Sequence, residues 1–406
     1  MFALRTSILF YIVLPGLSFA PNFSRRKDRF HYLFNVPVCL SQQKQLSSDE
    51  INESITPLMN LASAHITSQA LDTFVQLGVA DIIGDEKLSI EEVSSIIGPN
   101  TNEDALTRIF RLLVSADILV HESDIEIDLF SLSNTGALLQ TMVDGQPSLA
   151  SGVMHWMERP LWTSWLYLPE YIKGSLEKGN NLDPFERANG QSSDYYYNAK
   201  TEPRSLRHAN DFVRFISDTE IEGIVSSLDW SQFAGKAILD VGGYNGKVLD
   251  AIDASTPDVT FKSMKCLDLP QVIEGIKQKY TNVELIAGNI LDASTVPAAD
   301  VILLKHFLDR CMWNEEETVM ILTACHQKIP IDGQVIVAEA VIPDFDQAQE
   351  TNRLEIALDA LYMLVGRERQ RTEKEWENLA YKSGFRIEEI IRTISASSSL
   401  IVLTKK

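Results

Sequence analysis

The chain has 406 residues, of which 45% are hydrophobic and 23% charged, and this composition is typical of a globular protein with two to three domains. Its formal net charge of -20 argues against nucleic-acid binding, which needs a basic surface. The four cysteines, Cys39, Cys266, Cys311 and Cys325, have no paired short spacing, so the sequence predicts no metal site and no disulfide framework.

Residues 1–45 have the composition of a targeting presequence. Arg5 precedes an apolar run at residues 8–14 that is too short to anchor in a bilayer, and small residues follow it, as in a secretory signal peptide. Residues 20–32 are basic, hydroxylated and almost free of acid, as in an organellar transit peptide. The segment "SFAP" at residues 18–21 resembles the cleavage motif of bipartite plastid presequences. We therefore expect plastid localisation, with another organelle or the secretory pathway as the alternative, and no membrane association of the mature protein.

Residues 46–150 predict a small helical domain. Residues 45–54 are polar and are expected to join the presequence to the fold, whereas residues 66–77 carry an apolar helical stripe. Gly78 and Gly84 are expected helix stops, and Ser89 with Glu92 forms a capping box that starts a short helix. Later residues predict another helix and then a small hairpin, which is the order of a winged helix. Because the unit has no basic face, we expect it to serve dimerisation rather than DNA recognition.

Residues 151–227 predict linker helices and a substrate pocket. The segment is rich in Trp and Tyr, which line many ligand pockets, and Trp162 and Trp165 are candidate substrate contacts. Arg204, Arg207 and His208 follow on a predicted helix and are candidate cations for an acceptor that carries a carboxylate.

Residues 228–406 predict an α/β domain. Short apolar, partly β-branched runs alternate with helical stretches from residue 236 onward, which indicates a parallel sheet covered on both faces. The last two predicted strands, at residues 385–394 and 397–405, are separated only by a short loop. We expect them to form an antiparallel pair at the edge of the sheet.

A glycine-rich turn in this domain indicates a cofactor. The stretch is "AILDVGGYNGKVLDAID", in which Gly242, Gly243 and Gly246 let the backbone approach a ligand at a helix N-terminus. Asp240 would repel a phosphate and attract an amino group, and Asp268, at the end of the next strand, is placed to bind ribose hydroxyls. One acid for an ammonium and one for a ribose indicate S-adenosylmethionine.

Residues 51–406 resemble the class I small-molecule methyltransferases related to caffeate and hydroxyindole O-methyltransferases. The matching segments are "SQALDTFVQLGVADII", "LDVGGYNG", "DLPQVI", "AGNILD", "LLKH", "IPIDGQVIVAEAVIP" and "QRTEKEWENLAYKSGF". The resemblance implies a Rossmann-like sheet with an antiparallel last strand, a helical winged-helix-like dimerisation domain, a homodimer and a small-molecule substrate. It also implies further cofactor-binding residues, which are Leu269, Gly288, Asn289, Ile290 and Lys305.

The chain departs from this family where the O-methylating members keep their catalytic base. In those members a strand ending in "LK" is followed by a histidine that takes the proton of the substrate hydroxyl, and here Asp309 and then Arg310 stand at that place. Glu339 matches one acid that flanks the histidine, whereas Gln370 replaces the other. The candidate catalytic residues are therefore Asp309, His306 and Glu339, although His306 lies three residues before the family position.

The missing histidine favours an acceptor that has no proton to lose. A phenol, with a pKa of about 10, needs a base poised near neutrality, whereas a thioether sulfur attacks directly and becomes a sulfonium. One branch of the resembled family methylates the sulfur of 4-methylthio-2-hydroxybutyrate in dimethylsulfoniopropionate synthesis, and we expect S-methylation of that acceptor. The alternatives are O-methylation of a phenolic, indolic or other hydroxyl group, and a non-catalytic dimeric homologue.

Overall fold

The computed structural model describes residues 46–406 apart from short internal gaps, which are residues 125–126, 142–147, 175–181, 199, 277–279, 310–312, 346, 349–352, 367–368 and 394–397. The predicted presequence, residues 1–45, therefore lies outside the described residues, as does Arg310. The described residues up to Thr141 form one compact unit and those from Ser148 onward form a second.

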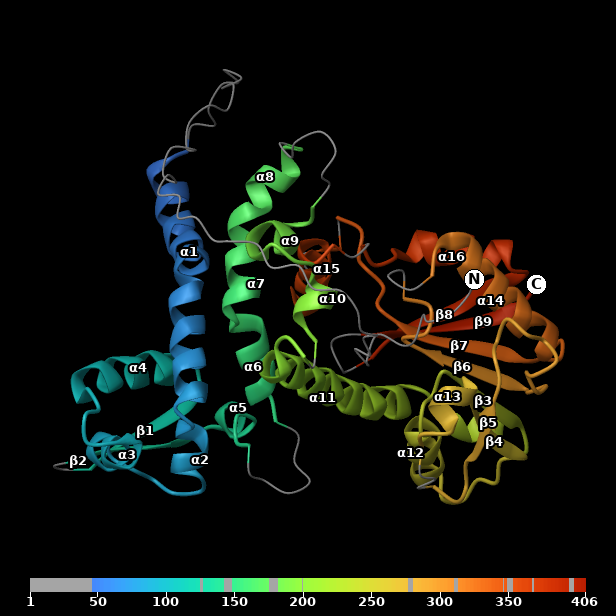
Figure 1. Cartoon of the computed structure of the whole chain (residues 1–406), viewed down its shortest axis with the longest axis horizontal. Helices are drawn as coiled ribbons and strands as arrows, with labels where there is room; N and C mark the ends of the chain where they lie inside the picture. Colours follow the sequence, from blue (N-terminus) through green and yellow to red (C-terminus); the bar gives the residue numbers. More distant parts are fainter. Residues whose placement is uncertain are drawn as a thin grey trace. The chain divides into compact units, whose positions relative to one another are not determined.

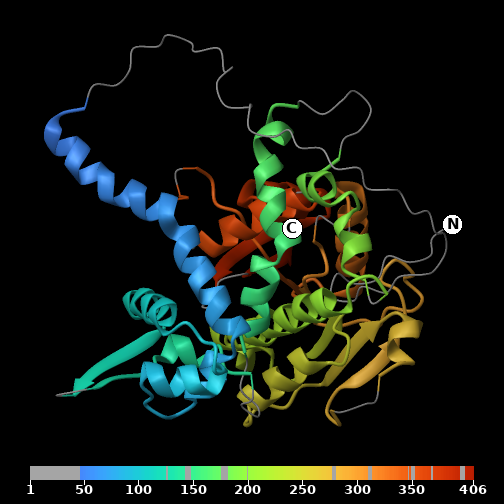
Figure 2. The same cartoon turned by 60° about the vertical axis from the view of Figure 1, so that its left-hand side comes forward.

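The N-terminal unit is helical with one small hairpin. Its helices are α1 (Ser48–Gln76), α2 (Val79–Ile83), α3 (Ile90–Ile97), α4 (Glu103–Ser115) and α5 (Asn134–Ala137). Strands β1 (Leu119–Asp124) and β2 (Ile127–Leu132) pair antiparallel after α4, and Figure 2 shows this hairpin beside α3 and α4. The winged-helix-like order predicted from the sequence is confirmed.

Helix α1 begins before the predicted position. Ser47 caps it by accepting a hydrogen bond from the Glu50 N–H, and the Glu50 side chain accepts one from the Ser47 N–H in return. This capping box starts the helix within the segment that the sequence predicted as a polar junction. Much of α1 is exposed, including a set of large apolar side chains, which are Ile51, Ile55, Leu58, Met59, Leu61 and Ile66. Neither α1 nor any other helix in the described ranges is long and apolar enough to cross a membrane.

The second unit begins with a run of helices. They are α6 (Ala150–Met157), α7 (Arg159–Ser164), the 3₁₀ helix η1 (Trp165–Tyr167), α8 (Leu168–Ile172), α9 (Pro184–Asn189), α10 (Ser193–Tyr196) and α11 (Pro203–Ser227). The sequence predicted a separate segment at residues 151–227. In the structure these helices lie in the same compact unit as the sheet, and Ile221 and Ile224 of α11 enter the hydrophobic core on one face of it.

A seven-stranded sheet forms the centre of the second unit (Figure 1). Its strands, in spatial order, are β5 (Glu284–Ala287), β4 (Ser263–Asp268), β3 (Ala237–Val241), β6 (Val301–Lys305), β7 (Gln334–Glu339), β9 (Ser399–Lys405) and β8 (Phe385–Arg392). All neighbours pair in parallel except β9, which runs antiparallel to both β7 and β8, as the sequence predicted. The chain reverses its direction of strand addition at β3, and ligands of such sheets bind outside the carboxyl ends of the strands at this switch point.

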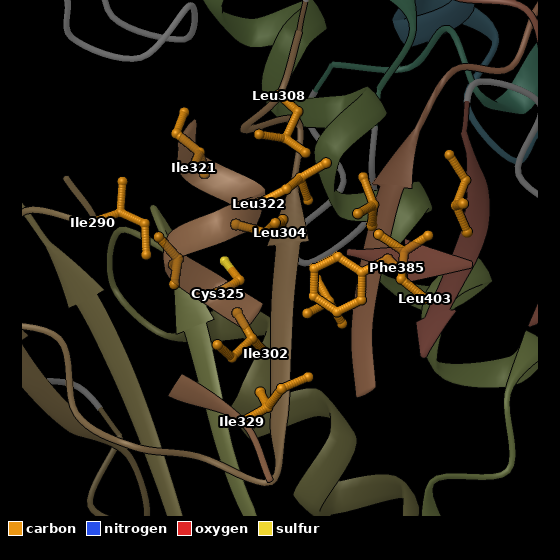
Figure 3. Close-up of a cluster of buried hydrophobic side chains, with 14 of the residues drawn as sticks. Ile290, Ile302, Leu304, Leu308, Ile321, Leu322, Cys325, Ile329, Phe385 and Leu403 are labelled. Atoms are coloured by element: carbon orange, nitrogen blue, oxygen red, sulfur yellow. The ribbon is translucent and has the colours of Figure 1, made fainter. Parts of the chain in front are cut away.

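Alternate residues of the buried strands point to opposite faces of the sheet. Leu239 and Ile302 face a core that includes α14 (Glu315–Lys328) and α16 (Glu373–Lys382), part of which Figure 3 shows. Ile238 and Leu303 face a second core that includes α11 and α12 (Lys247–Ser255). The remaining helices of the described residues are the 3₁₀ helix η2 (Trp230–Phe233), α13 (Pro270–Ile273) and α15 (Arg353–Leu364). Burial on both faces explains why these strands read as continuous apolar runs.

Candidate active site

The turn after β3 makes room for the carboxylate of Asp240. Gly242 and Gly246 have φ angles of 76° and 80°, a left-handed conformation that favours glycine. A Cβ on Gly243 would lie 2.1 Å from Asp240 Oδ2, so a larger residue there would displace the carboxylate. Gly246 is also the N-cap residue of α12, and the helix starts directly after the turn. The three predicted glycines therefore form one tight turn over the buried acid.

Asp240 is a buried acid whose carboxylate receives no hydrogen bond from the described residues. It is 1% exposed, and neither carboxylate oxygen has a hydrogen-bond partner among the described residues. Burial raises the pKa of Asp240 to about 7, while the charge of Lys305 opposes the increase and that of Asp268 adds to it. An unpaired buried carboxylate is costly, and a cationic ligand group would offset that cost. The ammonium of S-adenosylmethionine therefore fits this position.

Asp268, at the end of β4, is held in a fixed orientation by two backbone groups. Its Oδ1 accepts a hydrogen bond from the Leu269 N–H at 2.7 Å, and its Oδ2 accepts one from the Tyr244 N–H at 3.1 Å. Burial raises the pKa of Asp268, and these two hydrogen bonds oppose the increase. Each carboxylate oxygen can accept a second hydrogen bond, so the group keeps capacity for ribose hydroxyls.

Three predicted cofactor-binding residues, Gly288, Asn289 and Ile290, follow β5. A Cβ on Gly288 would lie 2.7 Å from Leu267 Cδ1, so a larger residue there would require the neighbouring side chains to shift. Asn289 is exposed, and its Oδ1 accepts a hydrogen bond from the Leu291 N–H at 3.0 Å. Ile290 is 4% exposed and its side chain packs in the hydrophobic core (Figure 3). Ile290 therefore remains a predicted cofactor residue only through its backbone groups, because its side chain lies in the core.

Glu220 joins α11 to the end of β6 through a buried ion-pair network. Its Oε2 lies 3.0 Å from Lys305 Nζ, and Lys305 Nζ also donates to Ser217 Oγ at 3.1 Å. His306 Nε2 lies 2.8 Å from both oxygens of Glu220. Glu220 is 0% exposed, so these partners provide the neutralisation that water cannot. Lys305, predicted as a cofactor residue, is therefore engaged with Glu220 while its charge also acts on Asp240.

The ring of His306 lies between two acids. Its Nδ1 is 3.5 Å from Glu339 Oε2, on the side opposite the Glu220 contact. Burial by itself would lower the pKa of His306, but Glu220 and Glu339 outweigh it and raise the pKa to about 10. The backbone of His306 has a φ of 46°, which turns the chain sharply at the end of β6. His306 is consequently an imidazolium at neutral pH, and it has no lone pair with which to accept a proton.

Glu339, at the end of β7, holds the loop that carries Asp309. Its Oε1 accepts a hydrogen bond from the Leu308 N–H at 2.8 Å. Burial raises the pKa of Glu339, His306 opposes the increase, and the nearby charge of Asp309 adds to it. Asp309 itself is 4% exposed. All three candidate catalytic residues, His306, Asp309 and Glu339, are thus brought together at the carboxyl ends of β6 and β7.

Arg371 fixes the same loop from the opposite side. Its guanidinium donates to the backbone oxygen of Leu308, to that of Trp313 at 3.3 Å, and to Thr318 Oγ1 at 3.0 Å. The neighbouring Gln370, which stands at the flanking-acid position, is buried, and its backbone N–H donates to Asp359 Oδ1 at 2.6 Å. The loop after β6 is therefore anchored by both Glu339 and Arg371.

The predicted acceptor-side residues fall into two groups. Trp165 in η1 and both arginines, Arg204 and Arg207, are exposed, and Trp162 on α7 is half-buried. His208 is mostly buried, and its Nδ1 lies 3.7 Å from Glu158 Oε1. Of the three predicted cations, only His208 therefore belongs to a buried polar cluster, and its nearest charged partner is an acid.

Sequence reasoning missed Glu220, Glu158, His155 and Arg371. Glu220 had a visible signal, because Phe212, Ile216, Glu220 and Ile224 recur at four-residue spacing along the buried side of α11. An acid in the middle of an apolar helical stripe requires a partner. The partner could not be identified from the sequence, because His306 lies 86 positions later in the chain.

The raised pKa of Asp240 predicts that cofactor binding depends on pH. In the free protein Asp240 is mostly protonated at pH 5.5 and becomes ionised as pH rises through about 7. A ligand ammonium favours the ionised form, so the affinity for S-adenosylhomocysteine should increase roughly tenfold between about pH 5.5 and 7.5. Calorimetric titration measures this increase. Asp240→Asn, which cannot ionise, should bind more weakly and show little pH dependence; equal pH dependence in both proteins would contradict the assignment.

Two family models match the chain. Residues 165–386 match an O-methyltransferase domain, and residues 59–141 match an O-methyltransferase dimerisation domain. The chain is 31% identical to 3'-hydroxy-N-methyl-(S)-coclaurine 4'-O-methyltransferase 1 of Papaver somniferum, over 85% of this chain and 94% of that protein. It is 29% identical to nicotinate N-methyltransferase 1 of Glycine max, over 84% of this chain and 94% of that protein.

Solved structures share the fold. A methyltransferase of calicheamicin biosynthesis in its SAH-bound form has a TM-score of 0.72 and 24% identity, covering 89% of this chain and all of that one. Human N-acetylserotonin methyltransferase in complex with SAM has a TM-score of 0.64 and 18% identity, covering 89% of this chain and 99% of that one. With both family models matched in chain order, the protein is a member of the O-methyltransferase family and uses S-adenosylmethionine as its methyl donor.

Proposed function

We propose that this methyltransferase transfers the methyl group to an acceptor atom that carries no proton. A thioether sulfur is the best candidate, and 4-methylthio-2-hydroxybutyrate is the acceptor to be tested first. The observation that carries the proposal is the position of the His306 ring between Glu220 and Glu339, two acids that raise its pKa to about 10 and favour the imidazolium. Asp309 stands where the family resemblance places a histidine base, so neither position supplies a neutral imidazole.

The chemistry of the acceptor determines whether the enzyme needs a neutral imidazole. A hydroxyl or phenol must lose its proton during methyl transfer, and a base with a pKa near the working pH is best suited to take it. The acceptor sulfur of a thioether instead contributes both electrons of the new S–C bond, and no proton is released. A site without a neutral imidazole is therefore adequate for a thioether and poorly suited to a phenol.

The chain's own part in such a reaction is to bind, orient and exclude water. S-adenosylmethionine supplies an electrophilic methyl group when bound, and Asp240 and Asp268 are the acids suited to its ammonium and ribose. Glu339 and Arg371 fix the loop after β6, so that Asp309 is held in one place. Holding both reactants in line is worth several kcal/mol without any proton transfer. Asp309 would also favour the positive charge that develops on the acceptor sulfur.

O-methylation is the competing function, and family membership does not exclude it. Relatives of similar identity are named for O-methylation and for N-methylation, so they do not identify the acceptor atom. Asp309 is the observation that favours O-methylation, because a buried carboxylate beside Glu339 is a potential proton acceptor. The two functions differ in what substitution of Asp309 does to the rate.

We also propose that two copies assemble through the N-terminal unit. The matched dimerisation domain covers residues 59–141, and α1 exposes large apolar side chains that water solvates poorly. Leu58 and Leu61 are 65% and 68% exposed and lie on neighbouring turns of α1. A two-fold contact between copies would bury this surface.

The acceptor proposal predicts a methylation rate that depends neither on a catalytic base nor on pH. Single-turnover methylation of 4-methylthio-2-hydroxybutyrate should vary by less than about threefold between about pH 7 and 9, because no substrate proton titrates there. Asp309→Asn should keep the rate of this step within about tenfold, or 1.4 kcal/mol, of the parent enzyme. Rapid-quench measurements on both proteins test this, with Asp344→Asn, which changes an exposed acid, as the matched control.

Direct competition between two acceptors can show that the sulfur proposal is wrong. A phenol and a thioether should be offered together with S-adenosylmethionine to the parent enzyme. Preferential methylation of the phenol, together with a loss of a hundredfold or more in Asp309→Asn, would show that Asp309 is a relocated base. The enzyme would then be an O-methyltransferase and the sulfur proposal would be wrong.

The assembly proposal predicts a dimer that dissociates when apolar residues of α1 are replaced by charged ones. The parent protein should sediment as a dimer at micromolar concentration. Leu58→Glu combined with Leu61→Glu should give monomers, because four charges would be buried at a two-fold contact. Glu53→Gln, an exposed polar change on the same helix, should remain dimeric. A monomeric parent would refute the proposal, as would an unchanged mass in the double variant.

A further inference from the structure

Asp240 and Lys305 point to the same face of the sheet from neighbouring strands. Asp240 on β3 pairs in register with Leu303 on β6, and Lys305 follows two positions later. Side chains two positions apart on a strand share a face, and Ile238 and Leu303 both lie in the core that includes α11. The Cα atoms of Asp240 and Lys305 are therefore about 8 Å apart, since parallel strands lie about 4.8 Å apart and rise about 3.3 Å per residue. A lysine side chain, with its flexible four-carbon stem, can span that distance.

The lysine nevertheless does not hydrogen-bond to the aspartate. Neither carboxylate oxygen of Asp240 has a hydrogen-bond partner within the described parts of the chain. Lys305 Nζ is held instead by two side chains of α11, because it lies 3.0 Å from Glu220 Oε2 and donates to Ser217 Oγ at 3.1 Å. Ser217 and Glu220 are three positions apart, so they lie on the same side of the helix. A buried acid and a hydroxyl therefore draw the lysine toward α11.

The groups that face Asp240 show what this arrangement leaves open. Burial raises the pKa of Asp240 to about 7, while the charge of Lys305 on β6 opposes the increase and that of Asp268 on β4 adds to it. Cys266 on β4 also faces Asp240, and burial together with the charge of Asp240 raises the pKa of that thiol, which stays protonated. Lys305 is the cation among these groups. It is near enough to act on Asp240, yet its hydrogen bonds go to α11.

We propose that Glu220 is a positioning residue that reserves Asp240 for the ammonium of S-adenosylmethionine. By holding Lys305 on α11, Glu220 prevents a lysine–aspartate pair that would satisfy Asp240 within the protein. The cofactor ammonium then meets an acid that the described residues leave unpaired, and binding does not have to break an existing ion pair. This role concerns the methyl donor, so it goes beyond the proposed acceptor and is the same whether the methylated atom is sulfur or oxygen.

Removing the charge of Glu220 should allow Lys305 to turn to Asp240. The amide of Glu220→Gln can still accept a hydrogen bond, but it no longer attracts a cation by its charge, whereas ionised Asp240 does. The new pair would lower the pKa of Asp240, so the acid would be ionised in the free protein between about pH 5.5 and 7.5. S-adenosylhomocysteine would then have to displace Lys305, and its binding would no longer require Asp240 to lose a proton.

Calorimetric titration of the full-length enzyme with S-adenosylhomocysteine tests this role without turnover. In buffers of different ionisation enthalpy, the parent should release close to one proton per site at about pH 6, where Asp240 is mostly protonated in the free protein. Glu220→Gln should release less than about 0.3 protons and bind S-adenosylhomocysteine about ten- to a hundredfold more weakly at about pH 7.5. Glu222→Gln, which changes an exposed acid on the same helix, should match the parent.

A second probe, 5'-methylthioadenosine, shows whether the effect depends on the ammonium. It keeps the adenine, the ribose and the thioether of S-adenosylhomocysteine but lacks the amino-acid group. Its affinity for Glu220→Gln should stay within about threefold of its affinity for the parent, because it carries no ammonium that competes with Lys305. An equal loss of affinity for both compounds would show that the substitution distorts the whole cofactor site, and it would contradict the proposal.

Two further variants test whether Lys305 carries the effect. When Lys305→Met is added to Glu220→Gln, no lysine can pair with Asp240, so proton release at about pH 6 should return to close to one per site and affinity at about pH 8 should recover to within about tenfold of the parent. Ser217→Ala removes the second side chain that holds Lys305 and should shift both quantities in the same direction as Glu220→Gln, by a smaller amount; it decides the question if Glu220→Gln does not fold. Parent-like proton release in every folded variant of Glu220 and Ser217, or a double variant that binds no better than Glu220→Gln, would overturn the proposal.

Discussion

The buried carboxylate of Glu220 is the interaction on which this active site depends. It lies on the apolar side of α11 and pairs at the same time with Lys305 and His306 at the end of β6. Removing one partner of a buried ion pair commonly costs about 3–5 kcal/mol, because the other charge remains in the protein interior. Glu220 thereby ties the helix to the strand that carries the catalytic loop. The same pairing keeps the imidazole of His306 protonated, which removes it as a base.

Buried polar groups in the unit that contains the sheet are of two kinds. Some are satisfied within the protein: Glu220 by Lys305 and His306, and Glu339 in part by the Leu308 N–H. Others are not satisfied by the described residues, and Asp240 and Glu158 are the clearest cases. Since leaving such a group unpaired is costly, Asp240 marks the place where the ammonium of the cofactor would complete the structure. Asp240 lies at the switch point of the sheet, as a cofactor site requires, whereas Glu158 lies on the helices that precede the sheet.

Much of the fold could be predicted from local patterns. Apolar runs separated by helical stretches predicted the strands of the sheet, and the Ser89–Glu92 capping box predicted the start of α3. The turn at Gly242 and the acids Asp240 and Asp268 were likewise predicted, because motif, strand end and charge lie close together in the sequence. A capping box at Ser47 was also present, but the polar residues around it favoured a junction over a helix.

The contacts that define the acceptor side could not be predicted in the same way. His306 is paired with a residue 86 positions earlier, and Glu158 meets His208 from a different helix, so no local pattern connects these groups. Ile290 shows a second difficulty: a motif gives the position of a residue but not the direction of its side chain, which here joins the core. Arg204 and Arg207 have the charge that an anionic acceptor needs, yet tertiary packing leaves both exposed.

The protonation state of His306 is the most direct test of this account. The ring Cε1 signal of His306, assigned with a His306→Asn variant among the seven histidines of the chain, can be followed by NMR from about pH 6 to 9. With a pKa of about 10, His306 should keep the chemical shift of an imidazolium across this range. A titration midpoint between about pH 6 and 7, near the ordinary value for histidine, would show a neutral ring at physiological pH and would contradict the conclusion that this site lacks an imidazole base.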